Sequence, residues 1–333
     1  MNFGRRLKAF VYFMVKATKL AFKQDSIDLV IATSTPLTIG VPALFLKWFK
    51  KIPFIFEVRD LWPEVPIQMG AIKNSLLKAV LRYFEKTIYR NAEHVVTLSP
   101  GMRDGVLKYI SQKKVSMIPN MPKIDEFWPR DKNEILIEKL SLNKDTFKIV
   151  HFGALGIANG AKTIIESAKI LKNDSTVEFL FLGGGSTESS LKKMCAESEL
   201  DNVKFLGNFP METNSEIVNF SDLSVVSFQD IPILYTNSPN KFFDSLSAGK
   251  PIIVNSKGWT KEIVESENCG YYVDPNKPFQ LVEKIKYLQE NPDVVQIMSL
   301  NSRRLAETKY DKSILVKQFS EVVDEVIHEI KLK

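Results

Sequence analysis

Short hydrophobic runs alternate along the chain with longer segments in which apolar residues recur at helical spacing. Residues 28–34, 52–58, 93–98 and 115–118 are runs of the first kind, and residues 75–90 form a segment of the second. Apolar runs of this length indicate strands covered on both faces, as in parallel sheets. The alternation of strand and helix therefore predicts an α/β fold built on parallel sheets.

The alternation of strand-like and helix-like segments is interrupted once and then resumes. Between residues 121 and 143 prolines and charged residues dominate, so we place an interdomain linker there. We expect a first domain over residues 1–130, a second over residues 145–310, and a last helix, residues 311–333, that returns to the first domain. The second domain is expected to have strands at residues 147–152, 177–182, 203–206, 223–228, 251–254 and 271–273, with helices between them.

Composition excludes several classes of protein. The 333 residues are 44% hydrophobic and 25% charged, which suits two globular domains. Cys195 and Cys269 are far apart and only three histidines are present, which excludes a disulfide framework and a Cys/His zinc cluster and points to a reducing cytoplasm. The sequence contains neither an apolar stretch long enough to span a bilayer nor the pattern of a signal peptide.

The net charge of +6 is unevenly distributed. The segment 3–23 combines aromatic residues with six basic residues that all precede the first acid, Asp25; these are Arg5, Arg6, Lys8, Lys16, Lys19 and Lys23. Such a helix can lie in the plane of an anionic membrane surface. It can equally pack on a core with a solvated basic edge, and the sequence leaves both open. Nucleic acid is disfavoured as a partner because no basic-aromatic reader module is present.

Residues 238–251, followed by the apolar run 252–254, predict a loop, a short helix and a buried strand. Ser238, Pro239 and Asn240 are expected at the helix start, where unpaired N–H groups and Lys241 would hold a phosphate. Asp244 follows one turn later, where an ionised carboxylate can accept hydrogen bonds from a ribose diol. The alternative is a capped helix that only leads into a strand.

This stretch resembles the donor-site segment of family 4 of the retaining glycosyltransferases, in the variant found in bacterial transferases that build O-antigen, capsule and colanic-acid-type chains. Asp244 matches the second acid of the family motif, and Thr236 stands at the position of the first. The resemblance implies a GT-B fold, in which two Rossmann-like domains face a cleft. Family members open with a further strand, glycine loop and helices before the equivalent of Asp28. We therefore expect the first domain to be incomplete, with the missing segment encoded separately or lost by truncation or a misplaced start.

Residues 57–64, Glu-Val-Arg-Asp-Leu-Trp-Pro-Glu, match the same transferases residue for residue. The resemblance implies that Arg59 and Asp60 line the cleft for acceptor and donor sugar and that Glu64 binds an acceptor hydroxyl. These three residues are our candidates for catalysis. The alternative is an Arg–carboxylate network that ties two loops together.

Glycine turns follow two strands of the second domain. Gly153 and Gly156 would let the backbone approach a diphosphate, while Ala154 and Asn159 stand where the family has an Arg and a Lys. Gly184 belongs to a second turn that either borders the nucleotide or is a simple tight turn. Phe209 and Phe228 are candidates to pack on a uracil ring, with core packing as the alternative.

The resemblance implies transfer of a sugar from a nucleotide-diphosphate sugar, with UDP favoured, to a polyprenyl-diphosphate-linked saccharide, with retention of configuration and without a metal cofactor. Such an enzyme would work at the cytoplasmic face of the cell membrane in surface polysaccharide synthesis. The competing interpretation is a truncated, non-catalytic homologue that still binds nucleotide. An NAD-dependent enzyme is disfavoured because Gly153, Gly156 and Gly160 have the wrong spacing.

Overall fold

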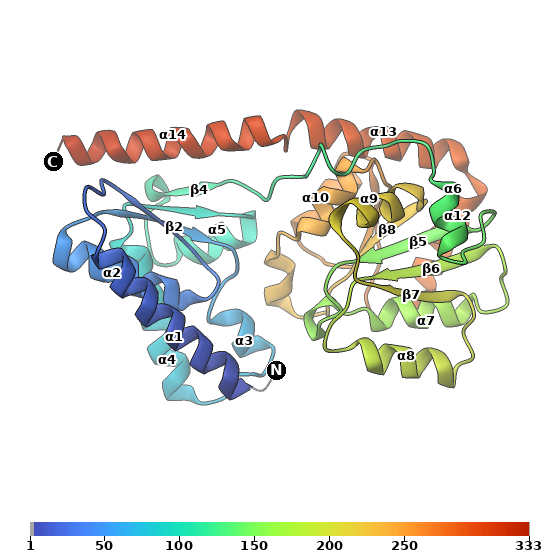
Figure 1. Cartoon of the computed structure of the whole chain (residues 1–333), viewed down its shortest axis with the longest axis horizontal. Coiled ribbons are helices and arrows are strands. Elements are labelled where there is room, and N and C mark those ends of the chain that lie inside the picture. Colours follow the sequence, from blue (N-terminus) through green and yellow to red (C-terminus); the bar gives the residue numbers. More distant parts are fainter. Residues whose placement is uncertain (1–2, 333) are drawn as a thin grey trace. The chain divides into compact units, whose positions relative to one another are not determined.

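The computed structural model describes residues 3–332, with side chains from Lys8 onward. The chain divides into two compact units (Figure 1). Unit 1 comprises Met1–Pro119, Thr236–Ser238 and Leu315–Lys333, and unit 2 comprises Asn120–Tyr235 and Pro239–Ile314.

Unit 1 is built on a four-stranded parallel sheet in the order β1-β2-β3-β4. The strands are β1 (Val30–Thr33), β2 (Phe54–Val58), β3 (His94–Thr97) and β4 (Val115–Met117). The helices are α1 (Phe3–Phe22), α2 (Gly40–Phe45), the π-helix η2 (Leu46–Lys50), α3 (Glu64–Gln68), α4 (Ser75–Asn91) and α5 (Pro100–Leu107), with short 3-10 turns at Leu37–Ile39 and Gln112–Lys114. Strand β3 is buried at all four residues, and β2 is buried at every residue except the partly buried Glu57.

Unit 2 contains a six-stranded parallel sheet in the order β10-β9-β8-β5-β6-β7. The strands are β5 (Phe147–Phe152), β6 (Val177–Leu182), β7 (Val203–Gly207), β8 (Leu223–Val226), β9 (Ile252–Val254) and β10 (Gly270–Tyr272). From β5 the chain first adds strands on one side and then returns to pair β8 on the other side. The carboxyl ends of β5 and β8 therefore form the point where the strand order reverses, which is where open α/β sheets bind ligands.

Helices α7 (Lys162–Ile170), α8 (Glu188–Glu197), α9 (Met211–Phe220), α10 (Asn240–Ser247) and α11 (Trp259–Ser266) fill the intervals between these strands, with 3-10 turns at Ile157–Asn159 and Pro232–Thr236. Helix α6 (Glu134–Lys139) precedes β5, and α12 (Pro278–Glu290), α13 (Pro292–Thr308) and α14 (Lys312–Lys331) follow β10. Most of α14 belongs to unit 1. The architecture confirms the predicted α/β class with two Rossmann-like parallel-sheet domains.

Two apolar layers cover the faces of the sheet in unit 2. Ile149 lies in the layer that contains helix α7 residues, and its neighbour Val150 lies in the opposite layer, because successive strand residues point to opposite faces. Phe127, Ile137 and Leu142 belong to the second layer. Much of the stretch at 121–143, which the sequence assigns to a linker, is thus packed into unit 2.

Within residues 3–332 no helix is both long enough and apolar enough to cross a membrane.

Candidate functional site

Helix α10 begins at the point where the sheet of unit 2 reverses its strand order. Pro239 precedes it and makes no side-chain cap hydrogen bond, while its carbonyl oxygen accepts from Phe242 N at 3.0 Å. Phe242, Phe243 and Leu246 are fully buried and fix the helix on the sheet. Gly249 then ends the segment with φ of +61°, a conformation that favours glycine. The predicted loop, helix and strand are all present.

Lys241, in the first turn of α10, lies against His151 of strand β5. The Lys241 Nζ atom is 3.5 Å from His151 Nε2, and His151 Nδ1 is 3.0 Å from the carbonyl oxygen of Val225. Burial and the nearby Lys241 charge hold the pKa of His151 well below its usual range. The neutral ring therefore donates from Nδ1 and accepts at Nε2. Burial lowers the pKa of Lys241 to about 8, so this ammonium is charged at neutral pH.

Three strand-to-helix loops pack against one another, and the first of them lies beside Lys241. Gly153 N donates to Leu182 O at 2.8 Å, Leu155 N to Gly184 O at 2.9 Å, and Gly183 N to Gly207 O at 2.7 Å. A Cβ on Gly183 would stand 2.1 Å from the carbonyl oxygen of Gly153, and Gly183 has φ of +125°. Gly153 itself has φ of +100°, and a Cβ there would lie 3.6 Å from Lys241 Cε. Glycine is required here because the loops pack backbone to backbone and Gly153 lies next to the ammonium group.

Asn159 closes the first of these loops on itself. Its Nδ2 donates to Ala154 O, and its own carbonyl oxygen accepts from Ser227 Oγ at 2.6 Å. Gly156, by contrast, has open space around it, because a Cβ would meet only Asn159 Nδ2 at 3.7 Å. The side chain of Asn159 thus holds the loop shape, and the glycine backbone stays accessible.

A cavity of about 410 Å³ lies over the ends of β5, β6 and β7. Its lining comprises Phe127, Phe152, Gly153, Ala154, Leu182, Gly183, Gly184, Asn208, Met211, Asn214 and Asp244. Phe127 and Phe152 stack with ring centroids 6.0 Å apart and give it an apolar wall. The sequence predicts Gly153, Gly184 and Asp244, but not Asn208, Met211 or Asn214, which come from the β7 loop and helix α9.

Asp244 is the one acid in this cavity lining. Its side chain is 7% exposed, and burial raises its pKa to about 6 against the opposing charge of Lys123. Its Oδ1 atom is buried and has no hydrogen-bond partner among the described residues. Asp244 also lines a second cavity of about 340 Å³ together with Asn240. A buried carboxylate with an unused acceptor fits a ligand that brings hydroxyl donors.

The two candidate aromatic residues lie outside the cavity lining. Phe209 is partly buried against the core layer of unit 2. Phe228 is 7% exposed, and its backbone N–H and carbonyl both bond to the side-chain amide of Asn255, at 2.7 and 3.0 Å. Ser238 is also buried. The positions of Phe209 and Phe228 fit the core-packing alternative that the sequence left open.

In unit 1, Arg59, Asp60 and Glu64 follow strand β2. Arg59 Nη1 lies 3.6 Å from Glu57 Oε1, and its backbone N–H donates to Ser34 Oγ at 3.0 Å. Burial raises the pKa of Asp60 to about 6, against the charge of Arg59. Asp60 therefore sits as a partly desolvated acid beside a guanidinium at the end of a buried strand.

Glu64 has a different set of contacts. Arg82 on α4 donates to both carboxylate oxygens, from Nε to Oε1 at 2.6 Å and from Nη2 to Oε2 at 3.3 Å. One turn further along α4, Glu85 is 2% exposed and accepts from the hydroxyl of Tyr89 at 3.0 Å. Glu64 thus takes part in an Arg–carboxylate pair, but this pair joins α3 to α4, whereas the alternative from the sequence has such a network between two loops.

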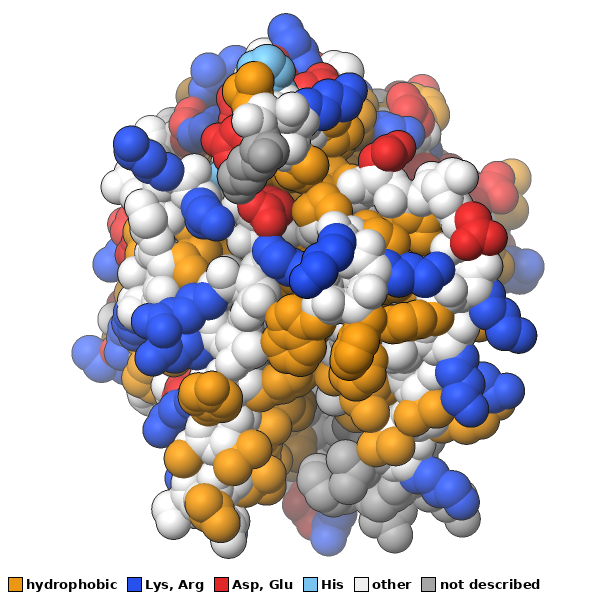
Figure 2. Space-filling model, turned by 90° about the vertical axis from the view of Figure 1, so that its left-hand side faces the viewer, with side chains coloured by type: hydrophobic (Ala, Val, Ile, Leu, Met, Phe, Trp, Pro, Cys, Tyr) orange, Lys and Arg blue, Asp and Glu red, His pale blue; other side chains and the backbone are white. Residues whose placement is uncertain are grey.

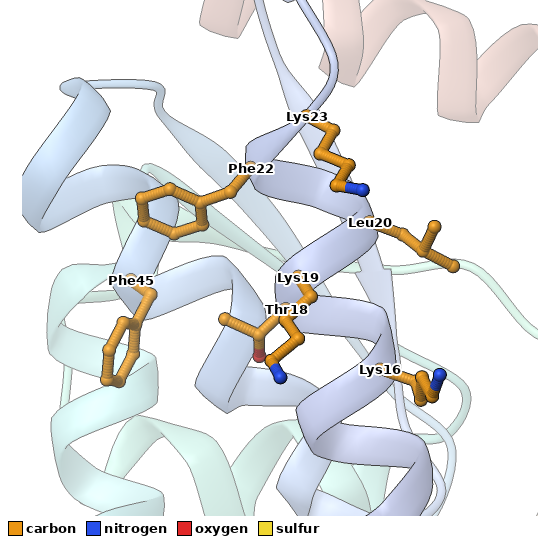
Figure 3. A pocket seen from close by; sticks show the side chains of 7 residues that line it. All are labelled: Lys16, Thr18, Lys19, Leu20, Phe22, Lys23 and Phe45. Carbon is orange, nitrogen blue, oxygen red and sulfur yellow. The ribbon is translucent and has the colours of Figure 1, made fainter.

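The outer surface of unit 1 combines apolar and basic side chains. Lys16, Lys19, Lys23, Thr18, Leu20, Phe22 and Phe45 line a cavity of about 470 Å³ on α1 and α2 (Figure 3). Tyr12 and Phe13 on α1 are 65% and 50% exposed, and Phe49 on η2 is 68% exposed. Figure 2 shows hydrophobic side chains beside lysines and arginines on this side of the molecule. These aromatic residues are outside the core, and the side chains of residues 3–7 lie outside the described part.

Two family matches cover most of the chain. Residues 132–305 match the family described as Glycosyl transferases group 1, and residues 4–121 match the Glycosyl transferase 4-like domain. The crystal structure of HepE from Anabaena in complex with UDP-glucose has the same fold, with a TM-score of 0.76 at 18% identity over 94% of this chain and 82% of that chain. The architecture is therefore the GT-B fold, as the sequence predicts.

Two curated relatives show more remote sequence similarity. The alpha-galactosylglucosyldiacylglycerol synthase of Streptococcus pneumoniae is 24% identical over 247 residues, which are 72% of this chain and 63% of that protein. The UDP-Gal:alpha-D-GlcNAc-diphosphoundecaprenol alpha-1,3-galactosyltransferase of Escherichia coli is 23% identical over 242 residues, which are 69% and 60%. The chain thus spans less than two thirds of the length of either relative.

Proposed function

The chain belongs to the group 1 glycosyl transferase family, and we propose that it transfers a sugar from a UDP-sugar to a lipid-linked acceptor with retention of configuration. The observation that carries this proposal is the position of Lys241, which lies beside Gly153 and His151 at the switch point of the sheet in unit 2. A charged ammonium, a helix start and a glycine backbone converge there. This is the combination that binds a diphosphate.

In the proposed complex the diphosphate lies on the first turn of α10, with Lys241 donating to its oxygens. His151 accepts a hydrogen bond from Lys241 and orients the ammonium without competing charge, because its ring is neutral. Asp244, one turn further along the helix, takes the ribose hydroxyls. The cavity beside Asp244 has room and an apolar wall for the base.

During transfer the bond between C1 of the sugar and the diphosphate oxygen breaks, and a bond from C1 to the acceptor oxygen forms on the same face. The acceptor hydroxyl gives its proton to the departing phosphate oxygen. Negative charge grows on the leaving diphosphate, and preorganised donors stabilise it most in a site closed to water. Lys241 and the α10 N–H groups supply those donors, so the proposal needs no metal ion.

The comparisons support the finer parts of the proposal. HepE was crystallised with UDP-glucose, and the name of the Escherichia coli relative gives a UDP-Gal donor and a diphosphoundecaprenol-linked acceptor. The streptococcal relative makes a diacylglycerol glycolipid. We extend these features to this chain as a UDP-sugar donor and a polyprenyl-diphosphate-linked acceptor in bacterial surface polysaccharide synthesis.

An acceptor embedded in a bilayer requires the enzyme to reach the membrane surface. We propose that the basic and aromatic face of unit 1, formed by α1 and η2, lies on the cytoplasmic leaflet. Lysine stems and aromatic rings at that face suit the headgroup region of an anionic bilayer.

Calorimetric titration with UDP and UDP-sugars, followed by transfer of a labelled sugar to lipid-linked saccharides, tests the proposed function. We expect the folded chain to bind UDP and to label a lipid acceptor with at least one donor. Binding of nucleotide without transfer to any lipid or saccharide acceptor would favour the non-catalytic homologue. A folded chain that binds no nucleotide would overturn both.

A further inference from the structure

Helix α4 of unit 1 turns apolar side chains toward solvent over its first half. Leu76 and Tyr83 are each 72% exposed, and Val80 is 54% exposed. The spacing i, i+4, i+7 places these three residues in one stripe along the helix. Glu85, nine residues after Leu76, lies on the opposite side of the helix and is buried. A surface helix of a globular domain normally has the reverse arrangement, with its apolar stripe toward the core.

Basic residues recur at every fourth position of the same helix, beside this stripe. They are Lys78, Arg82, Lys86 and Arg90. The one acid within α4 is the buried Glu85. The outer surface of α4 is therefore apolar along one line and positively charged along the next. This is the composition of helices that lie in the interface of an anionic bilayer, with lysine and arginine stems around an apolar stripe.

The shape and charge of the stripe decide among the molecules that could cover it. Leu76 and Tyr83 are too exposed to have walls beside them, so the stripe is a ridge and not a groove for a single lipid chain or a peptide. Pairing of α4 with the α4 of a second copy would bring two basic rows together without an exposed acid on either helix, and like charges repel. A broad anionic surface with an apolar interior complements both the stripe and the basic row.

We propose that α4 inserts Leu76, Val80 and Tyr83 into the headgroup region of an anionic bilayer and so forms a second membrane contact of unit 1. The inference rests on the proposed function and adds a contact on a helix other than α1 and η2. Helix α2 packs against both α1 and α4, and in Figure 1 both of these helices extend below the strands of unit 1. Contacts on two helices fix the orientation of unit 1 on a surface, whereas contact through one helix leaves it free to turn about the helix axis.

This contact also determines the distance between a candidate acceptor residue and the lipid surface. Arg82, in the basic row of α4, binds Glu64 of α3, with Nε 2.6 Å from Oε1. Glu64 is our candidate for binding an acceptor hydroxyl. Insertion of α4 therefore holds Glu64 at a constant distance from the headgroups to which a lipid-linked saccharide is attached.

A fluorescent probe at Tyr83 tests whether α4 enters the bilayer. Both natural cysteines are buried, so a thiol-reactive NBD probe can be directed to the variant Tyr83→Cys. We expect the emission of this probe to increase and to shift to shorter wavelength when phosphatidylglycerol vesicles are added at low salt, because the probe leaves water. The same probe on Leu300→Cys, a 64% exposed position of α13 in unit 2, should not respond.

Vesicle affinity gives a second measurement. Changing Leu76, Val80 and Tyr83 together to Ser should weaken binding to the same vesicles roughly 100-fold, because three apolar side chains no longer enter the interface. The matched control changes three exposed apolar residues of unit 2 to Ser and should leave the affinity unchanged. These are Phe279, Ile297 and Leu300, which are 51%, 51% and 64% exposed.

Different failures separate this inference from the proposed function. If the protein binds vesicles while the probe on Tyr83→Cys keeps its emission, α4 lies outside the bilayer, and the α1 face and the proposed function stand. A probe response to rising protein concentration without vesicles would assign the stripe to a second copy and overturn the inference. Equal losses of vesicle affinity in the two triple variants would overturn it as well. The probe variant changes one exposed residue, so its result holds even if the triple variant fails to fold.

Discussion

Lys241 Nζ and His151 Nε2 lie 3.5 Å apart, with the imidazole held on its other side by the carbonyl oxygen of Val225. The pair joins the first turn of α10 to the end of β5, the two elements that meet at the switch point of the sheet. Burial disfavours a charge on either side chain, and of the two only Lys241 is charged at neutral pH. The site therefore holds a single, oriented positive charge where we place the diphosphate.

The first prediction concerns this charge. Lys241→Met should weaken UDP binding by roughly 10- to 100-fold, because a hydrogen bond to a charged group contributes about 1.5–3 kcal/mol. Calorimetric titration with UDP measures the change. Lys250→Met is a matched control, because burial also lowers the pKa of Lys250 to about 8 but its Nζ donates to Asn219 O at 2.5 Å. Equal losses in the two variants would mean that Lys241 acts only through folding.

The second prediction is the pH dependence of nucleotide-sugar binding. Affinity should fall above about pH 8, where free Lys241 loses its proton, and below about pH 6, where Asp244 gains one. Titration with UDP-glucose is preferable to UDP, because a terminal phosphate itself titrates near pH 6. Lys241→Met should lose the alkaline decline and Asp244→Asn the acidic one. A flat profile across this range in the natural chain would contradict the assignment of both groups.

The sequence predicts the parts of this site that depend on local pattern. Buried strands that end in glycine, and a helix that starts at Pro239 with Lys241 and Asp244 one turn apart, are visible as spacing along the chain. Contacts between distant segments are not visible in this way. The pairing of Glu64 with Arg82 and the place of Asn214 in the cavity lining depend on how helices pack, and no local motif encodes either.

The stretch at 121–143 is a second case in which contacts with distant segments are not visible in the local sequence. Its prolines and charges predict a linker, yet Phe127, Ile137 and Leu142 bury their side chains in the core of unit 2. A few apolar residues are enough to dock a segment when a complementary surface is available, and that surface is formed by residues far away in the sequence.

The third prediction tests the buried acid of unit 1. Burial raises the pKa of Glu85 from 4.5 to about 7. The folded state thus keeps this proton up to about pH 7, whereas the unfolded chain releases it near 4.5, so stability is lost as pH rises through this window. Glu85→Gln keeps an acceptor for Tyr89 and removes that loss. Its free energy of unfolding should exceed that of the natural chain by on the order of 2 kcal/mol at pH 8, and the difference should vanish near pH 4.

Urea denaturation of both proteins at the two pH values measures this difference. Glu93→Gln is a useful comparison, because Glu93 pairs with a cation, Lys47 Nζ at 2.7 Å, where Glu85 has a tyrosine hydroxyl. The idea fails if Glu85→Gln destabilises the protein equally at both pH values, since that would show a packing role independent of the proton.

The last prediction concerns the outer face of unit 1, where Lys16, Lys19 and Lys23 surround an apolar cavity (Figure 3). Each lysine near an anionic bilayer contributes about 1 kcal/mol to the free energy of membrane binding. Changing all three to Gln should therefore weaken binding to phosphatidylserine vesicles by roughly 100-fold at low salt. The natural chain should release these vesicles as salt rises, because surface charges are screened. Phe49→Ser should weaken binding at every salt concentration, since its 68% exposed ring would enter the interface.

The control changes three exposed lysines of unit 2, Lys162, Lys169 and Lys193, to Gln and so alters the net charge equally. A comparable loss of vesicle binding in that control would mean that the net charge of the protein, and not this face of unit 1, drives the association. Vesicle binding that is insensitive to salt in all variants would exclude an electrostatic role for the three lysines of α1.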